Sequence, residues 1–144
     1  MFDLRANVIT ALAAASVNDV NANNDFKSTE QARADILGGR FPVTEAVLGV
    51  GDVRVIERKS WSWGKNLVRA EIDILMFTRL LNSTIEYGVD NELQTALTKN
   101  ELSTDDVLTC ELRSADSISK IHDNIWTRRW ILEVLILEDN VLAL

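Results

Sequence analysis

Alternation of apolar and polar residues is strictest between residues 68 and 76. Apolar side chains occupy every second position there: Val68, Ala70, Ile72, Ile74 and Met76. The positions between them include Arg69, Glu71 and Asp73. Because successive side chains of a strand point to opposite faces, this pattern predicts an antiparallel strand with one buried and one solvated face.

A second strand precedes the first, in VRVIERKSW, residues 53–61. The segment between the two strands is SWGKN, where Gly64 and Asn66 can adopt the positive φ angles that tight turns need. We therefore expect residues 52–77 to form one long β-hairpin. Trp61 and Trp63 would flank its tip.

Helical spacing of apolar residues appears in two segments, FDLRANVITALAAAS (2–16) and LNSTIEYGVDNELQTALTKN (81–100). In the second segment Asp90 and Glu92 fall on the face expected to be solvated. Residues 28–40 begin with possible caps and end on two glycines, which predicts a short helix. The asparagine-rich residues 18–27 are expected to form a mobile loop.

The remaining segments complete an α+β pattern. Residues 41–52 fit an edge strand leading into a turn. Residues 107–114 alternate, with Leu108, Cys110 and Leu112 on one face, and residues 115–124 are expected to be a connection. Residues 126–137 predict a last strand that is covered on both faces. We expect one α+β domain over residues 1–144, a mixed or antiparallel sheet with a long hairpin and helices packed on one side.

Composition narrows the functional classes. The 144 residues contain 22 acidic and 15 basic side chains, a net charge of −7, which argues against a protein that holds nucleic acid on a basic face. A single cysteine excludes an internal disulfide framework and suits a reducing cytoplasm. The start of the chain lacks the long apolar run of a signal peptide, and no segment predicts a membrane span.

Few residues carry candidate chemistry. His122 is the only histidine and lies in a polar segment, and Cys110 faces the predicted core. No phosphate-binding glycine motif and no zinc-ligand spacing occurs in the sequence. We interpret these two residues as a surface histidine and a buried thiol, and we expect no catalytic, cofactor or metal site and no enzymatic activity.

One enzymatic alternative stays open. Glu57 and Lys59 form an acid-x-Lys triplet downstream of Asp52, residue types that restriction-type nucleases use to hold Mg²⁺ and orient a water molecule. Those nucleases place the Asp and the triplet on two paired strands, and five positions leave no room for a turn. Glu71 and Asp73 lie on one strand face, where a solvated surface is the default. A Mg²⁺-dependent nuclease is therefore the more remote hypothesis.

Basic residues gather on the hairpin and at the start of the last strand, while other segments are acidic. Such segregation fits self-association, in which the basic arm of one subunit contacts the acidic face of another. Exposed tryptophans at a hairpin tip are typical of interface anchors. The hypothetical interface contains Arg58, Lys59, Trp61, Trp63, Lys65, Arg69, Arg128 and Arg129.

Two simpler interpretations of the same residues remain. The arginines and lysines could be the ordinary solvent face of a strand. The hairpin tryptophans could fold back onto Trp126 and Trp130 and close the end of the core.

The order of these segments resembles the tail terminator (tail completion) proteins of long-tailed bacteriophages. The corresponding pieces are LRANVITAL, VRVIERKSW with LVRAEIDILMF, VDNELQTALTKN, VLTCELRSADS and IWTRRWILEVLI. The resemblance implies a non-enzymatic virion protein of the tail or neck, present in the host cytoplasm during assembly. It implies a hexameric ring that caps the tail tube, ends its polymerisation and joins it to the head.

The resemblance also implies a set of partners: further copies of the chain, the tail tube protein, the head–tail connector protein and, in contractile tails, the sheath protein. DNA would only pass through the bore of the ring, because an acidic protein would not bind DNA tightly. No membrane partner is implied. A head-completion or neck adaptor protein is the alternative role.

Overall fold

A computed structural model describes seven stretches of the chain: residues 4–15, 46–62, 64–78, 89–97, 107–115, 118–122 and 125–139. The predicted short helix at 28–40 and the predicted loop at 18–27 lie outside these residues. The described elements are α1 (Leu4–Ala15), β1 (Ala46–Ser62), β2 (Lys65–Thr78), α3 (Val89–Ala96), β3 (Val107–Ser114), β4 (Ser119–His122) and β5 (Ile125–Asp139).

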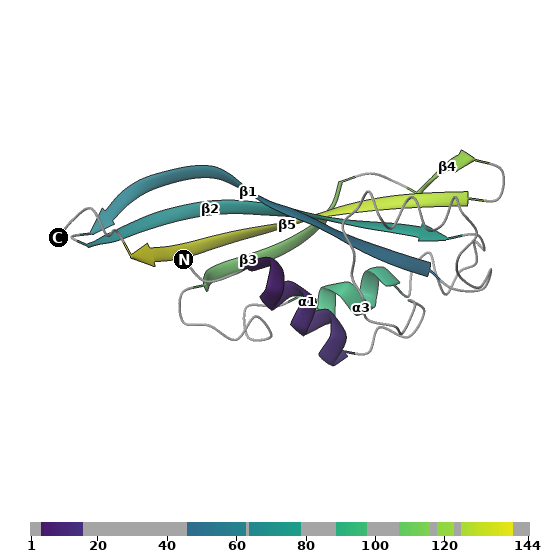
Figure 1. Cartoon of the computed structure of the whole chain (residues 1–144), viewed down its shortest axis with the longest axis horizontal. Helices are drawn as coiled ribbons and strands as arrows, with labels where there is room; N and C mark the ends of the chain where they lie inside the picture. The colour runs from purple at the N-terminus through teal and green to yellow at the C-terminus, as the bar shows by residue number, and fades with distance from the viewer. Residues whose placement is uncertain are drawn as a thin grey trace.

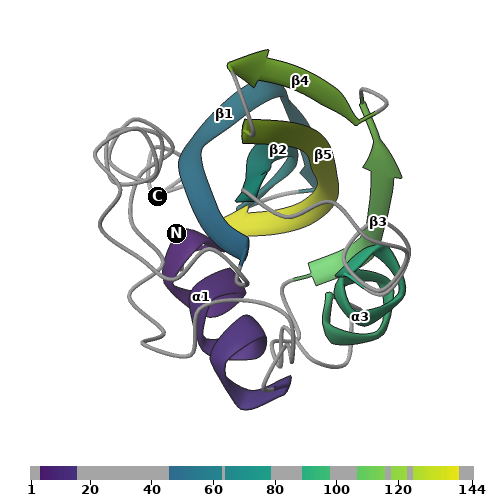
Figure 2. The same cartoon turned by 90° about the vertical axis from the view of Figure 1, so that its right-hand side faces the viewer.

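One antiparallel sheet dominates the described part of the chain. Its strand order is β1-β2-β5-β3, and β4 pairs with β5 beyond the end of β3. The strands coil strongly along their length, and α1 and α3 lie together on one side of them (Figures 1 and 2). The predicted α+β class with helices on one side of the sheet is confirmed, and the antiparallel option holds for every described strand pair.

The core forms between the helices and one face of the sheet. The alternating apolar residues of β2 that predicted the strand are at most 1% exposed. Residues from α1 and α3 belong to the same buried cluster, among them Val8, Leu12 and Leu93. The guanidinium of Arg5 in α1 also donates from Nε and Nη2 to the carbonyl of Val50 in β1, at 3.2 and 3.0 Å. Apolar burial and this polar contact together hold α1 against the hairpin.

The hairpin is longer than the sequence pattern predicted. β1 begins at Ala46 and continues without interruption through Gly49 and Gly51, so the turn expected near residue 52 is wrong. A shift in the pairing between Val50 and Val53 marks a β-bulge there instead. Bulges absorb an extra residue without ending the strand, which explains why glycines that suggested a turn lie inside β1.

The hairpin turn follows the sequence more closely. Gly64 has a φ of 79°, as predicted, while Asn66 lies in β2 and pairs with Ser60. The connection expected at 115–124 contains the short strand β4, so that expectation is wrong for its centre. In β3 the pairing shifts between Val107 and Thr109, and Val107 is buried in place of the half-buried Leu108.

α3 covers the described part of the second predicted helix. Leu93, Ala96 and Leu97 are buried as the helical spacing predicted. Asp90 was expected in solvent but is half-buried against β5. Within the described residues, no helix combines the length and hydropathy that a membrane crossing requires.

Candidate interaction surface

The sheet has a second face, opposite α1 and α3, which we call the outer face. Cross-strand partners share a face, so the pairing places Arg69, Glu71 and Asp73 of β2 there. Glu71 pairs with Glu133 of β5, and Glu133 pairs with Glu111 of β3. Three carboxylates therefore stand in one row across three strands, an arrangement that like-charge repulsion would disfavour without nearby cations.

Arg54 of β1 supplies one of these cations. Its Nη1 and Nη2 donate to the two carboxylate oxygens of Asp73 at 2.7 and 3.0 Å, and Nη2 also donates to Glu71 at 3.1 Å. The hydrogen bonds to Asp73, and next those to Glu71, raise the pKa of Arg54 above its ordinary value. This bidentate geometry is the strong form of an Arg–carboxylate contact.

Arg113 of β3 supplies the second cation from the other side of the row. Its Nε donates to Glu133 at 2.7 Å, and its Nη2 lies 3.9 Å from Glu71. The hydrogen bond to Glu133 raises the pKa of Arg113. The outer face thus carries a network in which arginines from β1 and β3 flank carboxylates of β2 and β5. Glu71 and Asp73 were expected on a solvated face, but in this network their side chains are half-buried, 17% and 19% exposed.

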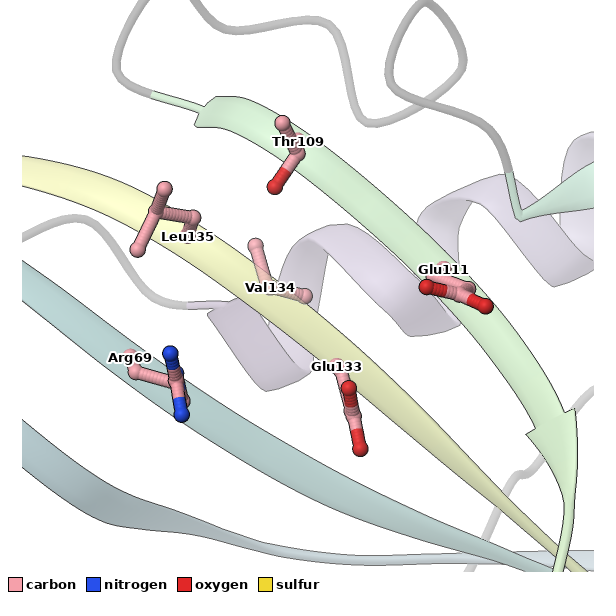
Figure 3. A pocket seen from close by; sticks show the side chains of 6 residues that line it. All are labelled: Arg69, Thr109, Glu111, Glu133, Val134 and Leu135. Atoms are coloured by element: carbon pink, nitrogen blue, oxygen red, sulfur yellow. The ribbon is translucent and has the colours of Figure 1, made fainter.

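An open cavity of about 280 Å³ lies beside this network. Figure 3 shows its lining: Arg69 of β2, Thr109 and Glu111 of β3, and Glu133, Val134 and Leu135 of β5. The walls combine one cation and two carboxylates with the side chain of Leu135, while Val134 is only 1% exposed. Glu133 lines the cavity and also accepts a hydrogen bond from Arg113. The cavity is therefore part of the outer face and of its charge network.

β1 presents the most exposed stretch of the described sheet. Every residue from Arg54 to Ser60 is exposed. Val55 and Ile56 are 42% and 50% exposed, the only large hydrophobic side chains so exposed in the described residues. Ile56 has no partner in β2, because the pairing shifts between Val55 and Glu57. The edge strand therefore carries an apolar pair on a bulge, with charges on both sides of it.

The predicted interface residues of the hairpin are divided between exposed and paired positions. Arg58 is exposed, but its Nη2 lies 3.3 Å from Glu138 of β5, and Lys59 lies 3.7 Å from Glu57. Arg69 lines the cavity, and Lys65 begins β2 and is half-buried. Basic residues were expected to gather on the hairpin; with carboxylates of the same chain beside Arg54 and Arg58, its surface is of mixed charge.

The side chains of the two hairpin tryptophans lie outside the described residues. Trp61 lies in β1, but its side chain is outside the described part, and Trp63 is outside it altogether. Their role as anchors, and the alternative that they cover Trp126 and Trp130, stay predictions. Trp130 itself is fully buried, and Trp126 is half-buried with Lys120 5.5 Å from its ring centre.

Arg128 and Arg129 were predicted at the interface, but both are half-buried. Arg128 lies over the ring of Trp130 at 4.8 Å, donates to Ser114 at 3.2 Å and approaches Asp90 to 3.6 Å. The backbone carbonyl of Arg129 accepts a hydrogen bond from Ala115. Arg128 therefore connects β5 with β3 and α3 inside one subunit.

Trp130 and Asp90 form a contact that the sequence analysis missed. The indole Nε1 donates to Oδ1 of Asp90 at 2.7 Å, which satisfies the polar end of a fully buried ring. An acidic residue on the first turn of a helix is a weak signal by itself. Only the packing of α3 against β5 identifies Asp90 as the acceptor.

The residues of the nuclease alternative share one strand. Asp52, Glu57 and Lys59 all lie on β1 and are exposed, and two bulges interrupt the strand around them. The described residues contain no group of three or more His, Cys, Asp or Glu side chains placed to hold a metal ion. The structure thus leaves these residues without the paired-strand arrangement that the nuclease hypothesis requires.

The thiol of Cys110 is half-buried against the core, and its Sγ lies 3.5 Å from the carbonyl of Leu97. Burial raises its pKa to about 11. A raised pKa suppresses the thiolate, which is the nucleophilic form. His122 ends β4, and its side chain is outside the described part.

Two comparisons with known proteins were made. A scan against protein-family models found no match to the chain, and a search of curated protein sequences found no significant match.

Proposed function

We propose that the protein is a structural component of a phage virion that resembles tail terminators. Copies of it form a ring that caps the tail tube, ends tube polymerisation and joins the tube to the head connector, with a sheath contact if the tail is contractile. The proposal combines the resemblance in element order with the geometry of the hairpin. It includes no catalytic step.

One observation carries the proposal. The hairpin of β1 and β2 extends past α1 and α3 (Figure 1), and β1 is exposed from Arg54 to Ser60. A long exposed strand with apolar side chains at a sheet edge promotes association with another chain, and soluble monomers usually protect such edges. In a protein that functions by assembling with other chains, such an exposed edge strand would serve as a contact surface.

The arrangement of charges is consistent with a passive structural role. Arg54 and Arg113 of the outer face are paired with carboxylates of the same chain, and the whole chain has a net charge of −7. A surface of this kind offers few unpaired cations to phosphates. DNA could therefore pass near the protein without strong binding.

The test is an assembly reaction with the tail tube protein encoded in the same genome. Tube growth is followed by light scattering, and tube ends are viewed by negative-stain electron microscopy. We expect the protein to form rings, to sit at one end of each tube and to stop growth at substoichiometric amounts. Tube growth that continues unchanged, with no density at either end, would sink the proposal.

Two variants sharpen this test. Trp61→Ala with Trp63→Ala is expected to abolish capping while the monomer keeps its circular dichroism spectrum, if the tryptophans are anchors. Asn91→Lys, an exposed change on α3, is the matched control and should cap normally. Binding to the connector protein alone, without tube capping, would favour the neck adaptor role.

A further inference from the structure

Within the described part of the chain, the outer edge of β1 carries no paired strand. β1 is the terminal strand of the sheet, and β2 occupies only one of its two edges. In the described part of the chain, no other strand pairs with it. Among the described residues, no strand pairs with residues 54–60 on the side away from β2, and an edge of this kind is the usual template for an added strand.

The bulge at Ile56 changes which residues of β1 share a face. Arg54 pairs with Glu71, and Glu57 pairs with Arg69, so both lie on the outer face although they are three positions apart. Two positions separate neighbours on one face of a regular strand. The extra residue therefore makes the stretch from 52 to 59 symmetric about a point between Val55 and Ile56.

We propose that two copies of the chain pair through their β1 edges, antiparallel and about a two-fold axis between Val55 and Ile56. In this register Val55 faces Ile56 of the second copy, and Arg54 faces its Glu57. Asp52 then faces Lys59 of the second copy. Each contact occurs twice, so the apolar centre has two pairs of opposite charge on each side, with Val53 facing Arg58 between them.

The sequence order itself argues for a second copy as the partner. Read outward from the centre, DVRVIERK places Val55 against Ile56, Arg54 against Glu57, Val53 against Arg58 and, at the ends, Asp52 against Lys59. Three of these four pairs match in character, and the pair of Val53 and Arg58 sets an apolar side chain against a cation without a like-charge contact. Moving the two-fold axis to Ile56 would place Arg54 against Arg58, a like-charge contact. Self-complementarity of this kind is what an interface with two-fold symmetry requires.

The other edge of the sheet is less suited to this role. There Gln94 of α3 donates to the carbonyl of Leu112 in β3 at 3.3 Å, so the helix already contacts that strand's backbone. β1 has no such contact between 54 and 60 among the described residues. A β1–β1 contact is therefore favoured over a contact between β1 and β3 of two copies.

The contact does not rest on the proposed function. An interface with two-fold symmetry closes on itself and cannot propagate a ring. It describes the protein in solution, where pairing protects the exposed edge. One strand pair buries less surface than a standard interface, so the dimer should dissociate on dilution in the micromolar range.

Charge changes at the ends of the register provide the test, because both residues are exposed. In Asp52→Lys the introduced lysine would face Lys59 of the second copy, and in Lys59→Glu the introduced glutamate would face Asp52. We expect each variant to dimerise at least about tenfold more weakly than the wild type, measured by sedimentation velocity and native mass spectrometry.

Mixing the two single variants is the decisive experiment. A mixed dimer contains one copy of each variant. At one end the introduced lysine and the introduced glutamate face each other, with their charges in reversed positions. This end cannot form in a dimer of either variant alone, so the mixture is compared with each variant by itself. The contact between the introduced lysine of one copy and the introduced glutamate of the other is attractive, and the remaining end keeps its original pair of Asp52 and Lys59. An equimolar mixture should therefore form a heterodimer of intermediate mass at wild-type affinity.

The double variant D52K/K59E should restore the homodimer, because each end then carries the original pair of charges in reversed positions. Asn91→Lys, which adds a charge on α3, controls for non-specific charge effects and should dimerise as the wild type does.

The contact would be overturned by a wild type that stays monomeric at all concentrations, by single variants that dimerise normally, or by a mixture that fails to form the heterodimer. A hexamer unaffected by these substitutions would also overturn it while leaving the ring proposal intact. A restored heterodimer with no capping of tubes would support the contact and contradict the proposed function.

Discussion

Trp130 shows how a single buried residue connects the layers of the fold. Its ring is fully buried, its Nε1 donates to Asp90 at 2.7 Å, and Arg128 lies 4.8 Å from its centre. A buried indole needs an acceptor for its N–H group, and α3 supplies it. The contact fixes the position of α3 relative to β5 with one polar interaction inside an apolar surface.

The contribution of this hydrogen bond can be measured at Asp90. Asp90→Ala removes the acceptor and leaves the buried N–H group of Trp130 unsatisfied, which should lower the free energy of unfolding by about 1–3 kcal/mol in urea titrations. Asp90→Asn keeps an oxygen acceptor and should lose less than half as much. Equal losses in the two variants would show that charge, not hydrogen bonding, is what matters.

Cys110 provides a second residue-level prediction. With its pKa raised from 9.0 to about 11 by burial, the folded thiol has about a hundredfold less thiolate near pH 8. Its reaction with a chromogenic disulfide should therefore be about a hundredfold slower than in the chain unfolded by urea. A folded protein that reacts as fast as the unfolded one would show that the thiol is accessible and unperturbed.

The same raised pKa gives a dependence of stability on pH. Below pH 9 the thiol is protonated in both the folded and unfolded states, so Cys110 has no effect there. Between pH 9 and 11 only the unfolded chain ionises, and the free energy of unfolding falls. The substitution Cys110→Ala should remove this part of the alkaline destabilisation.

At the scale of elements, the sequence predicted some strands better than others. The difference depends on how much of each strand is defined by its own pattern and how much by the strands that pair with it. The alternation in β2 identified its buried face because every second residue from Val68 to Met76 is buried, so the pattern is not interrupted along that stretch. β4 was missed because four residues carry too little pattern, and its pairing with β5 defines it. The bulges in β1 were missed for a related reason, since a bulge is defined by the partner strand.

The candidate site was less predictable than the fold. Side-chain type placed Glu71 and Asp73 on the outer face, but not their binding by Arg54, which depends on the register of β1. Asp90 was expected in solvent because its partner, Trp130, is 40 residues away. Arg128 was expected at an interface, yet its cation packs inside the subunit. Such long-range pairings depend on topology, which local patterns do not encode.

The hairpin turn depends on one conformation, that of Gly64. Its φ of 79° is unfavourable for residues with a Cβ, and no atom lies within 4 Å of where a Cβ would be placed. Gly64→Ala should therefore lower the free energy of unfolding by about 1 kcal/mol through backbone strain alone. Gly64→Asn should be milder, because Asn tolerates this region better. Equal stability of Gly64→Ala and wild type in urea would contradict this account.

The charge network of the outer face predicts a salt-dependent effect. Arg54→Met removes the cation beside Glu71 and Asp73, and we expect a loss of about 1 kcal/mol at low ionic strength because these carboxylates then repel one another. The loss should shrink in about 1 M salt. Asn91→Met is the control, since Asn91 is exposed on α3, outside the network, and its replacement should change the free energy of unfolding little. An effect of Arg54→Met that does not change with salt would point to packing instead.

At the scale of the whole molecule, the two faces of the sheet have different roles. One face buries its apolar residues against α1 and α3, and this provides the stability of the domain. The outer face and the edge of β1 contribute little to that core, so their exposed residues are available for contacts with other chains. The separation explains why β1 can carry Val55 and Ile56 in solvent while β2, directly beside it, is anchored.

Hydrogen exchange at two protein concentrations would show which surface of the molecule is used in association. Amides of β2 and β5, at the centre of the sheet, should exchange slowly at any concentration, since both edges of each strand are paired. Amides within 52–59 should be fast in dilute protein and gain protection when it is concentrated, if β1 edges pair. Protection confined to residues 61–65 would instead locate the contact at the hairpin tip, where the ring proposal places its anchors. Concentrated protein with the exchange pattern of dilute protein would mean that neither surface associates without a further partner, and tail tube protein would then be added to the same measurement.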